Sequence, residues 1–331
     1  MAFEQGTASG VSDLFDKLST FLVANGWTDR ALTTAGTKGF ARTAATDPIE
    51  VQFRWDTGTP ANVGVYHSLG FVGVGTAPGS HTDDSGQGVI SGTNATLATG
   101  RHVALVNSTM RYWFFEEDYY CHVCVEVNVG PPSQIVSFGM GNLVKLGTYT
   151  GGAYCYGFKR SGVASTGIMI DGSILLDGLA SGTAMTPFVA TLHAELLAGQ
   201  TAAEEWYLVW ADSTAAFQGT DRAGDDRHFV QGGFRGGLPA RFFARPSAQA
   251  VAGLIPMYSI PLYYRNIVPS PTHVYPLGHM PDVFGVNIEW FNPGDEVDVG
   301  GQTYVLFPSW RNNLGGGNET RFQGMAYRKI P

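Results

Sequence analysis

The sequence predicts a mainly β fold, with antiparallel strands in a sandwich-like arrangement and a short α-helix near the N-terminus. Three observations lead to this prediction. Glycine supplies 44 of the 331 residues, roughly twice its usual share of ~7 %. Charged residues make up only 15 % of the chain, against a usual ~25 %. Several stretches alternate apolar and polar residues, which is the period of a strand with one buried face.

The helix is predicted over residues 11–25. Its apolar residues recur at helical intervals, so that they form one face, and Gly26 can end it in the left-handed conformation. The residues expected on the buried face are Val11, Leu14, Phe15, Leu18, Phe21 and Leu22.

Strands are expected from residue 49 onward. In residues 49–55 the side chains of Ile49, Val51, Phe53 and Trp55 share one face of a strand. The sequence DTGTP at residues 56–60 is typical of a turn, and a second strand is expected at residues 63–67.

A hairpin is predicted between residues 112 and 127. Residues 112–115 and 119–127 are expected to form its strands, and Glu116-Glu117-Asp118 has the polarity of an exposed turn between them. Farther along, residues 193–210 fit either a short helix followed by a strand or a pair of strands.

The C-terminal part carries two turn signals. Asn292-Pro293-Gly294 predicts a turn, and Gly300-Gly301 between two apolar stretches predicts a two-residue hairpin. Residues 311–323 are rich in glycine and asparagine, which predicts an exposed loop before a last strand at residues 325–329.

The expected organisation has three parts. They are an N-terminal helix with a β domain at residues 1–161, a central β region at residues 162–253 and a C-terminal β region at residues 254–331. A single continuous domain is the alternative.

Composition excludes several function classes. A net charge of −8 without clustered Lys and Arg argues against nucleic acid as a partner. No apolar run approaches the ~18–20 residues of a membrane span, and the first residues show no export signal, so no membrane insertion is expected. Only five residues are lysine, which indicates that much of the surface meets other protein.

The three cysteines, Cys121, Cys124 and Cys155, do not suggest a disulfide framework, and synthesis in a reducing compartment fits them. Cys121 and Cys124 have the spacing of a zinc or redox motif. In a strand, however, residues three apart point to opposite faces, so both are expected to be core residues. The eight histidines are scattered, with His273 and His279 the nearest pair, and none has metal-ligand spacing. No metal and no cofactor are therefore expected.

A glycoside hydrolase needs at least two carboxyl groups at its active site, and the chain has several groups of neighbouring acidic residues. Each lies in an expected loop, where charge is needed for solvation alone. No serine-hydrolase elbow or nucleotide-binding loop accompanies them. We therefore expect no enzyme activity and no catalytic residues, and a polysaccharide depolymerase is the less favoured reading. The acidic groups are Asp83-Asp84, Glu116-Glu117-Asp118, Glu204-Glu205 and Asp225-Asp226.

Aromatic residues gather in short runs. In Tyr112-Trp113-Phe114-Phe115 neighbouring side chains face both sides of a strand, so a second layer or another subunit must cover part of the run. Packing is the first interpretation, and a contact to protein or sugar is the second. The other groups are Tyr149 with Tyr154 and Tyr156, Tyr263-Tyr264, and Trp290-Phe291.

The segment SFGMGNLVKLGTYTGGAYCYG, residues 137–157, has a glycine-rich start and a lysine that suggest a phosphate-binding loop. A dinucleotide loop needs a third glycine where Val144 stands, and a Walker loop ends in Gly-Lys-Ser/Thr, whereas Lys145 is followed by Leu146. We expect instead a strand at residues 135–138, a bend at residues 139–141 and a turn at Gly151-Gly152.

Several segments together resemble a family of virion structural proteins of tailed bacteriophages and prophages. They are MAFEQGTASGVSDLFDKLSTFLVANGWT at the start, VYHSLGFVGVGTAPGSHTDDSGQG at residues 65–88, SFGMGNLVKLGTYTGGAYCYG, and PGDEVDVGGQTYVLFPSWRNN followed by GMAYRKIP. The resemblance covers both ends and much of the first half, and about residues 162–250 carry none of it. It implies no catalytic residues.

The resemblance implies a subunit of a virion, made in the host cytoplasm and assembling through symmetric protein contacts at the tail, the baseplate or an appendage. Its partners are then copies of itself and other virion proteins. Two alternatives stay open: a capsid decoration or head-fibre protein, and an adhesin that binds a bacterial receptor or glycan through loops at residues 81–88 and 311–323.

Overall fold

The computed structural model describes the following parts of the chain, and every structural statement below concerns them alone: residues 2–29, 36–42, 49–55, 65–71, 101–105, 108–128, 134–157, 189–195, 206–210, 228–232, 257–266, 273–288, 291–308 and 323–330.

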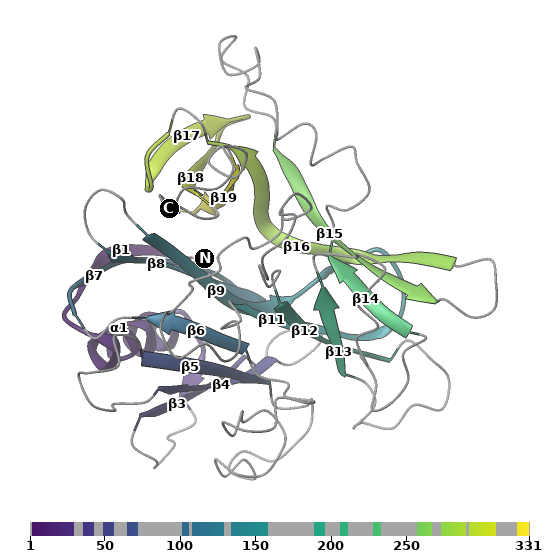
Figure 1. The fold of residues 1–331 in the computed structure, drawn as a ribbon, viewed down its shortest axis with the longest axis horizontal. Coiled ribbons are helices and arrows are strands. Elements are labelled where there is room, and N and C mark those ends of the chain that lie inside the picture. The colour runs from purple at the N-terminus through teal and green to yellow at the C-terminus, as the bar shows by residue number, and fades with distance from the viewer. Residues whose placement is uncertain are drawn as a thin grey trace, which may run out of the picture.

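The described residues form two sheets and one helix, α1 (Val11–Ala24) (Figure 1). The larger sheet has 14 strands. In spatial order they are β1 (Ala2–Ala8), β7 (Met110–Glu117), β8 (Tyr120–Asn128), β9 (Gln134–Asn142), β11 (Thr150–Gly157), β12 (Val189–Glu195), β13 (Trp206–Trp210), β14 (His228–Gly232), β15 (Tyr258–Asn266), β16 (His273–Asn287), β19 (Gln323–Lys329), β18 (Gln302–Pro308) and β17 (Asp295–Val299), while β10 (Val144–Lys145) pairs with β16.

The smaller sheet contains β2 (Thr28–Asp29), β3 (Thr37–Arg42), β4 (Ile49–Trp55), β5 (Val65–Phe71) and β6 (Arg101–Leu105). Among the described pairings, β13 and β14 are parallel and the others are antiparallel. The predicted class, a mainly antiparallel β fold with a short N-terminal helix, is confirmed. The larger sheet takes strands from all three of the expected sequence regions, whose division into domains stays a prediction.

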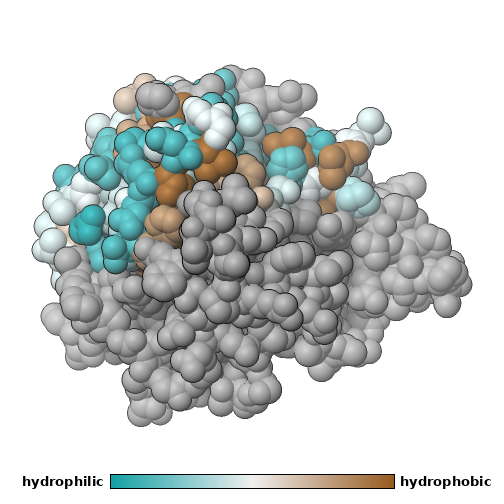
Figure 2. Space-filling model, turned by 90° about the horizontal axis from the view of Figure 1, so that it is seen from above, coloured by the Kyte–Doolittle hydropathy of each residue, from teal (hydrophilic) through white to brown (hydrophobic). Residues whose placement is uncertain are grey.

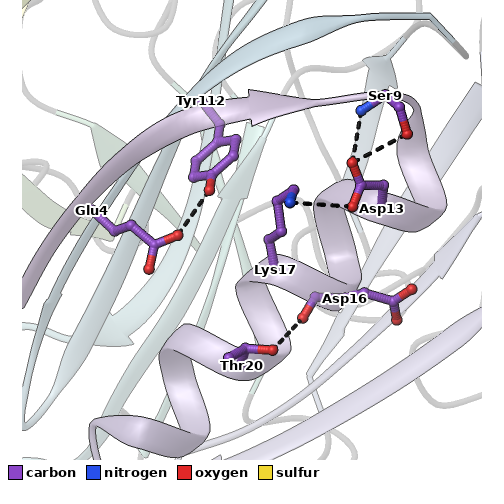
Figure 3. Close-up of polar contacts among 7 residues, drawn as sticks. All are labelled: Glu4, Ser9, Asp13, Asp16, Lys17, Thr20 and Tyr112. Carbon is purple, nitrogen blue, oxygen red and sulfur yellow. Dashed lines mark hydrogen bonds and ion pairs between the residues drawn. The ribbon is translucent and has the colours of Figure 1, made fainter.

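The helix is confirmed nearly residue for residue. It runs from Val11 to Ala24, and the six residues predicted for its inner face are all buried. Gly26 follows in the left-handed conformation, with a φ of 85°, as expected of a residue just past a helix end. At the other end, the Ser9 backbone N–H donates to Asp13 Oδ2 at 2.7 Å, and Asp13 pairs with Lys17 (Figure 3).

The core explains why aromatic residues run consecutively in β7. Trp113 and Phe115 contact Phe307 and Tyr327 of the C-terminal strands, at ring-centroid distances of 4.9 and 5.1 Å. Phe114 points the other way and contacts Phe21 of α1 at 5.5 Å. The β7–β8–β9 part of the large sheet is thus a central layer between the C-terminal strands and a layer made by α1 and the small sheet (Figure 1). The second layer that the aromatic run required lies within the chain itself.

The small sheet packs its apolar face as the sequence predicted. Ile49 and Phe53 of β4 are fully buried, and the Phe53 ring lies 6.1 Å from that of Phe138 in β9. The strand predicted at residues 63–67 is β5, which runs from Val65 to Phe71.

Glycines at the C-terminal turns have the conformations predicted for them. Gly294 has a φ of 88°, and Gly300 and Gly301 have φ values of 59° and 80° between β17 and β18. Residues 193–210 contribute to a strand pair, β12 and β13, and not to a helix where the structure describes them. The last strand, β19, begins two residues earlier than predicted.

The segment 137–157 departs from its prediction in two places. No bend occurs at residues 139–141, because β9 continues to Asn142. Gly141 instead allows close contact between strands, since a Cβ there would lie 2.6 Å from Cβ of Tyr120. Gly151-Gly152 lies within β11 as a bulge, where Gly152 has a φ of 110°, and not in a separate turn.

The upper face of the molecule, above the C-terminal strands, is shown in Figure 2. Its described residues are mostly hydrophilic, with apolar side chains in small groups between them. In the part of the chain that the structure describes, no helix has the length and apolarity needed to cross a membrane.

Candidate functional site: the acidic turn between β7 and β8

Glu116, Glu117 and Asp118, here called the acidic turn, lie at the end of β7 and in the turn to β8. The prediction of an exposed three-residue turn is wrong for the first two, because they are the last residues of β7 and the turn proper is Asp118-Tyr119. Glu116 is 1 % exposed. Since neighbouring side chains of a strand point to opposite faces, Glu116 shares the face of Phe114 and Glu117 that of Phe115.

Glu116 connects β7 to the end of the helix. Its Oε1 accepts a hydrogen bond of 2.9 Å from Trp27 Nε1. Burial raises the pKa of the Glu116 carboxyl, and the Trp27 hydrogen bond and the Arg42 charge offset part of that rise. A fully buried carboxyl group is thereby held between β7 and the residue that follows α1.

Arg42 extends this connection to the small sheet. Its guanidinium forms an ion pair with Asp118, with 2.6 Å between Nη2 and Oδ1, and also donates to the backbone carbonyl of Asn25. A cation at the C-terminal end of a helix stabilises the helix dipole. Arg42 of β3 thus joins the small sheet to both the helix end and the acidic turn.

Glu117 points to the opposite layer, where it meets Asp282 of β16. The pKa of Glu117 is raised by burial, by a hydrogen bond with Asp282 and by the charge of that residue, whereas Arg328 acts in the lowering direction. Tyr120 donates its hydroxyl to Asp282 Oδ2 at 2.9 Å, and Arg328 Nη1 lies 3.4 Å from Asp282 Oδ1. Asp282, whose side chain is 15 % exposed, is thus held by a tyrosine hydroxyl and by Arg328.

An irregularity in β16 places Asp282 there. The pairing with β15 moves from Phe284 to His279 while β15 advances only from Ser259 to Pro261, so extra residues bulge out of β16. Asp282 has a φ of 51°, a conformation that Asp tolerates better than most residues. Bulges of this kind aim a side chain away from the regular ladder.

Tyr120 and His122 complete the face around Asp282. Their rings are stacked at 4.7 Å, and His122 Nε2 donates to the backbone carbonyl of Pro281 at 3.1 Å. Burial lowers the pKa of His122 to about 4 and raises that of Tyr120 far above its usual range, with Asp282 as the next cause. At neutral pH both rings are uncharged hydrogen-bond donors.

The two described cysteines lie on opposite faces of β8, as predicted. Cys121 is paired across the ladder with Glu116, and Cys124 is paired with Trp113, on the face of the C-terminal strands. Cys124 Sγ lies 3.5 Å from Ser137 Oγ. Burial raises the pKa of both thiols, which keeps them protonated and poorly nucleophilic.

The other predicted acidic groups, Asp83-Asp84, Glu204-Glu205 and Asp225-Asp226, lie outside the described residues. So do the loop predicted at residues 81–88 and, except for Gln323, the loop predicted at residues 311–323. His279 is half-buried, and burial lowers its pKa. Within the described ranges, no three His, Cys, Asp or Glu residues lie close enough to hold a metal ion.

Asp282, Arg328, Trp27 and Arg42 were not singled out from the sequence. The one available signal was the Pro281-Asp282 pair, which is typical of a turn or bulge and stands inside a strand-like stretch. Trp27 gives none, because the sequence places its partner Glu116 in solvent. Arg42 gives none either, because its partners, Asp118 and the Asn25 carbonyl, are far from it in the sequence.

The geometry of the acidic turn suits a structural contact between layers better than glycoside hydrolysis. Glycosidases place two carboxyl groups ~5–9.5 Å apart around a substrate. Here the side chains of Glu116 and Glu117 lie on opposite faces of β7, and Glu116 is sealed from solvent.

Known proteins give no guide to this site: no protein-family model matches the chain, and comparison with curated proteins finds no significant match.

Proposed function

We propose that the chain is a non-enzymatic structural subunit of a tailed-bacteriophage virion, made in the host cytoplasm and assembled with copies of itself and other virion proteins. The observation that carries this proposal is that the acidic turn, whose residue types could serve in catalysis, uses its side chains for contacts between layers. Glu116 accepts a hydrogen bond from Trp27, and Asp118 forms an ion pair with Arg42. Tyr120, the cross-strand partner of Glu117, donates to Asp282, so that these contacts hold three layers together. The phage assignment itself rests on the sequence resemblance.

The two end strands of the large sheet suggest where such a subunit meets a neighbour. Edge strands offer unpaired backbone groups, and charged side chains discourage another strand from adding to them. On β17, Glu296 and Asp298 are exposed, whereas the exposed side chains of β1 are the uncharged Gln5 and Thr7. Of these two strands, β1 is the better suited to pair with a strand of a neighbouring subunit.

Side chains on both faces of β1 contact other strands of the chain, which favours β1 as a rigid edge for strand addition. Phe3 packs on Phe115 with 5.3 Å between ring centroids, and Lys329 of β19 lies 4.9 Å above the Phe3 ring. On the opposite face, Glu4 accepts a hydrogen bond of 2.8 Å from Tyr112 (Figure 3). A strand adding at β1 would therefore meet an ordered backbone.

Mass spectrometry of purified particles from the phage or induced prophage that encodes the chain tests the proposal. We expect the chain to be present in a fixed copy number relative to other virion proteins. Its absence from intact particles would contradict the proposal.

The role of β1 has its own test. A phage lacking the chain is supplied with a variant carrying Gln5→Lys and Thr7→Lys, and incorporation into particles is measured. We expect strongly reduced incorporation, because two charges then oppose strand addition. Ser12→Lys, at an exposed position of α1, is the matched control and should incorporate normally. Equal incorporation of both variants would remove β1 from the interface.

A further inference from the structure

We infer that β1 pairs with β1 of a second copy of the chain, antiparallel and about a two-fold axis at Gln5, so that two large sheets join into one. This inference rests on the proposed use of β1 as an interface, and it names the strand that meets it there. A two-fold contact of this kind is closed, because each copy offers the same strand to the other.

The edge of β1 carries little that would repel an incoming strand. Among the strands that the structure describes, β1 ends the larger sheet, with β7 as its neighbour. Its sequence, AFEQGTA, holds a single charged residue, Glu4. Tyr112 of β7 donates its hydroxyl to Glu4 at 2.8 Å (Figure 3). That hydroxyl lies above Gly6, where an added Cβ would be 2.6 Å from it. The Glu4 carboxylate is thereby held over β1 itself, and does not stand beyond the edge as a guarding charge.

The register about Gln5 sets compatible side chains opposite one another. Glu4 of each copy then faces Gly6 of the other, and Phe3 faces Thr7. Gln5 faces its own counterpart, and two side-chain amides can each donate to the other and accept from it. No position of the strand is left opposite a like charge.

Other antiparallel registers of β1 with itself are less favourable. An axis at Glu4 would set two carboxylates directly opposite each other, which destabilises a strand pair. An axis at Gly6 would pair only residues 4–8, whereas the axis at Gln5 pairs the whole strand, residues 2–8. The register about Gln5 therefore combines the longest pairing with no opposed charges.

The other end strand of the larger sheet, β17, is unsuited to either kind of contact. Pairing β17 with itself about Val297 would set Glu296 against Asp298 on both sides of the axis, and both side chains are exposed. An antiparallel contact between β1 and β17 that aligned Gln5 with Val297 would set Glu4 against Asp298. A second copy thus fits β1 best through its own β1.

Disulfide formation in the isolated full-length chain tests this register. Gln5→Cys places two thiols at the two-fold axis, where the Cα atoms of opposite residues are about 4.5–5.5 Å apart and can be bridged. Thr7→Cys is the matched control on the same face of β1, because its two copies lie roughly 13 Å apart along the strands and cannot be bridged. Ser12→Cys, exposed on α1, is the control for random collision.

After mild oxidation, we expect most of the Gln5→Cys chain at twice the single-chain mass, with peptide mapping placing the bond at residue 5. Both controls should stay at the single-chain mass. Cys121 and Cys124 are buried, so they should take no part. If Gln5→Cys stayed at the single-chain mass, or cross-linked no more than the controls, the two-fold contact would be overturned.

Failure of this contact is distinguishable from failure of the proposed virion role. If the chain is found in purified particles but its Gln5→Cys variant does not cross-link, the virion role stands and the two-fold contact falls. If the variant cross-links but the chain is absent from particles, the two-fold contact stands and the virion role falls.

Discussion

Glu116 and Glu117 are neighbours in the sequence, yet they lie in opposite faces of β7 and in unlike environments. Glu116 is sealed between β7 and the end of α1, with an indole donor and Arg42 nearby. Glu117 meets a second carboxylate and is partly open to solvent. Strand alternation alone separates them. The comparison teaches that one short acidic stretch can fasten two different layers.

The aromatic neighbours of the two glutamates give the largest expected effect. Phe114→Ala and Phe115→Ala should each lower the free energy of unfolding by about 3–5 kcal/mol, because each leaves a cavity in a packed layer. Urea titration measures the loss. If Phe115→Ala cost less than about 1 kcal/mol, the packing of the C-terminal strands on β7 would be far weaker than the ring contacts indicate.

His122 should make the Glu117 face sensitive to acid. Its folded pKa of about 4 lies below the ordinary value of 6.5, so its contribution to stability is present above pH 6.5 and is lost as pH falls toward 4. The loss amounts to about 3 kcal/mol.

This expectation is checked by measuring the free energies of unfolding of His122→Gln and of the wild-type chain between pH 7 and pH 4. The variant should be less stable at neutral pH and should lose less on acidification. Parallel curves for the two proteins would show that His122 does not titrate in this range.

Removing one hydrogen-bond donor from each face of β7 should lower the free energy of unfolding by a smaller amount, similar for the two faces. Trp27→Phe deprives Glu116 of its donor, and Tyr120→Phe deprives Asp282 of one. Each should cost about 1–3 kcal/mol at pH 7, because a buried acceptor loses a partner. Thermal unfolding measures both. If only Trp27→Phe lowered the free energy of unfolding, the contact between Tyr120 and Asp282 would stabilise the fold no more than an exposed surface contact does.

The smallest effect is expected at the exposed pair of Lys329 and Glu296. Both side chains reach solvent, and the Nζ–Oε1 distance is 2.8 Å. Glu296→Gln should change the unfolding free energy by less than about 0.5 kcal/mol. A loss above 1 kcal/mol in urea titration would mean that this pair belongs to a larger network.

Local sequence patterns correctly predicted the elements that are determined by residues close together in the sequence. Helical periodicity found α1 and its six buried residues, and paired glycines found the turn between β17 and β18. The acidic turn was misplaced because charge is ordinarily a sign of exposure. The hydrogen-bond donor to the buried Glu116 is Trp27, 89 positions away, and no local pattern shows such a partner.

The same limit applies to Asp282. Its place opposite Glu117 results from the bulge in β16 and from packing of the C-terminal strands on β7. Both are long-range consequences of the whole sheet. A bend was predicted at residues 139–141, yet Gly141 lies within β9. Glycine is needed at this position because the Tyr119-Tyr120 backbone approaches it closely.

Hydrogen–deuterium exchange of Trp27→Phe and Tyr120→Phe, measured side by side by mass spectrometry, tests most directly whether the two glutamates fasten different layers. We predict faster exchange in α1 and β3 for Trp27→Phe, and in β16 and β19 for Tyr120→Phe. Faster exchange in the same set of strands for both variants would contradict the account.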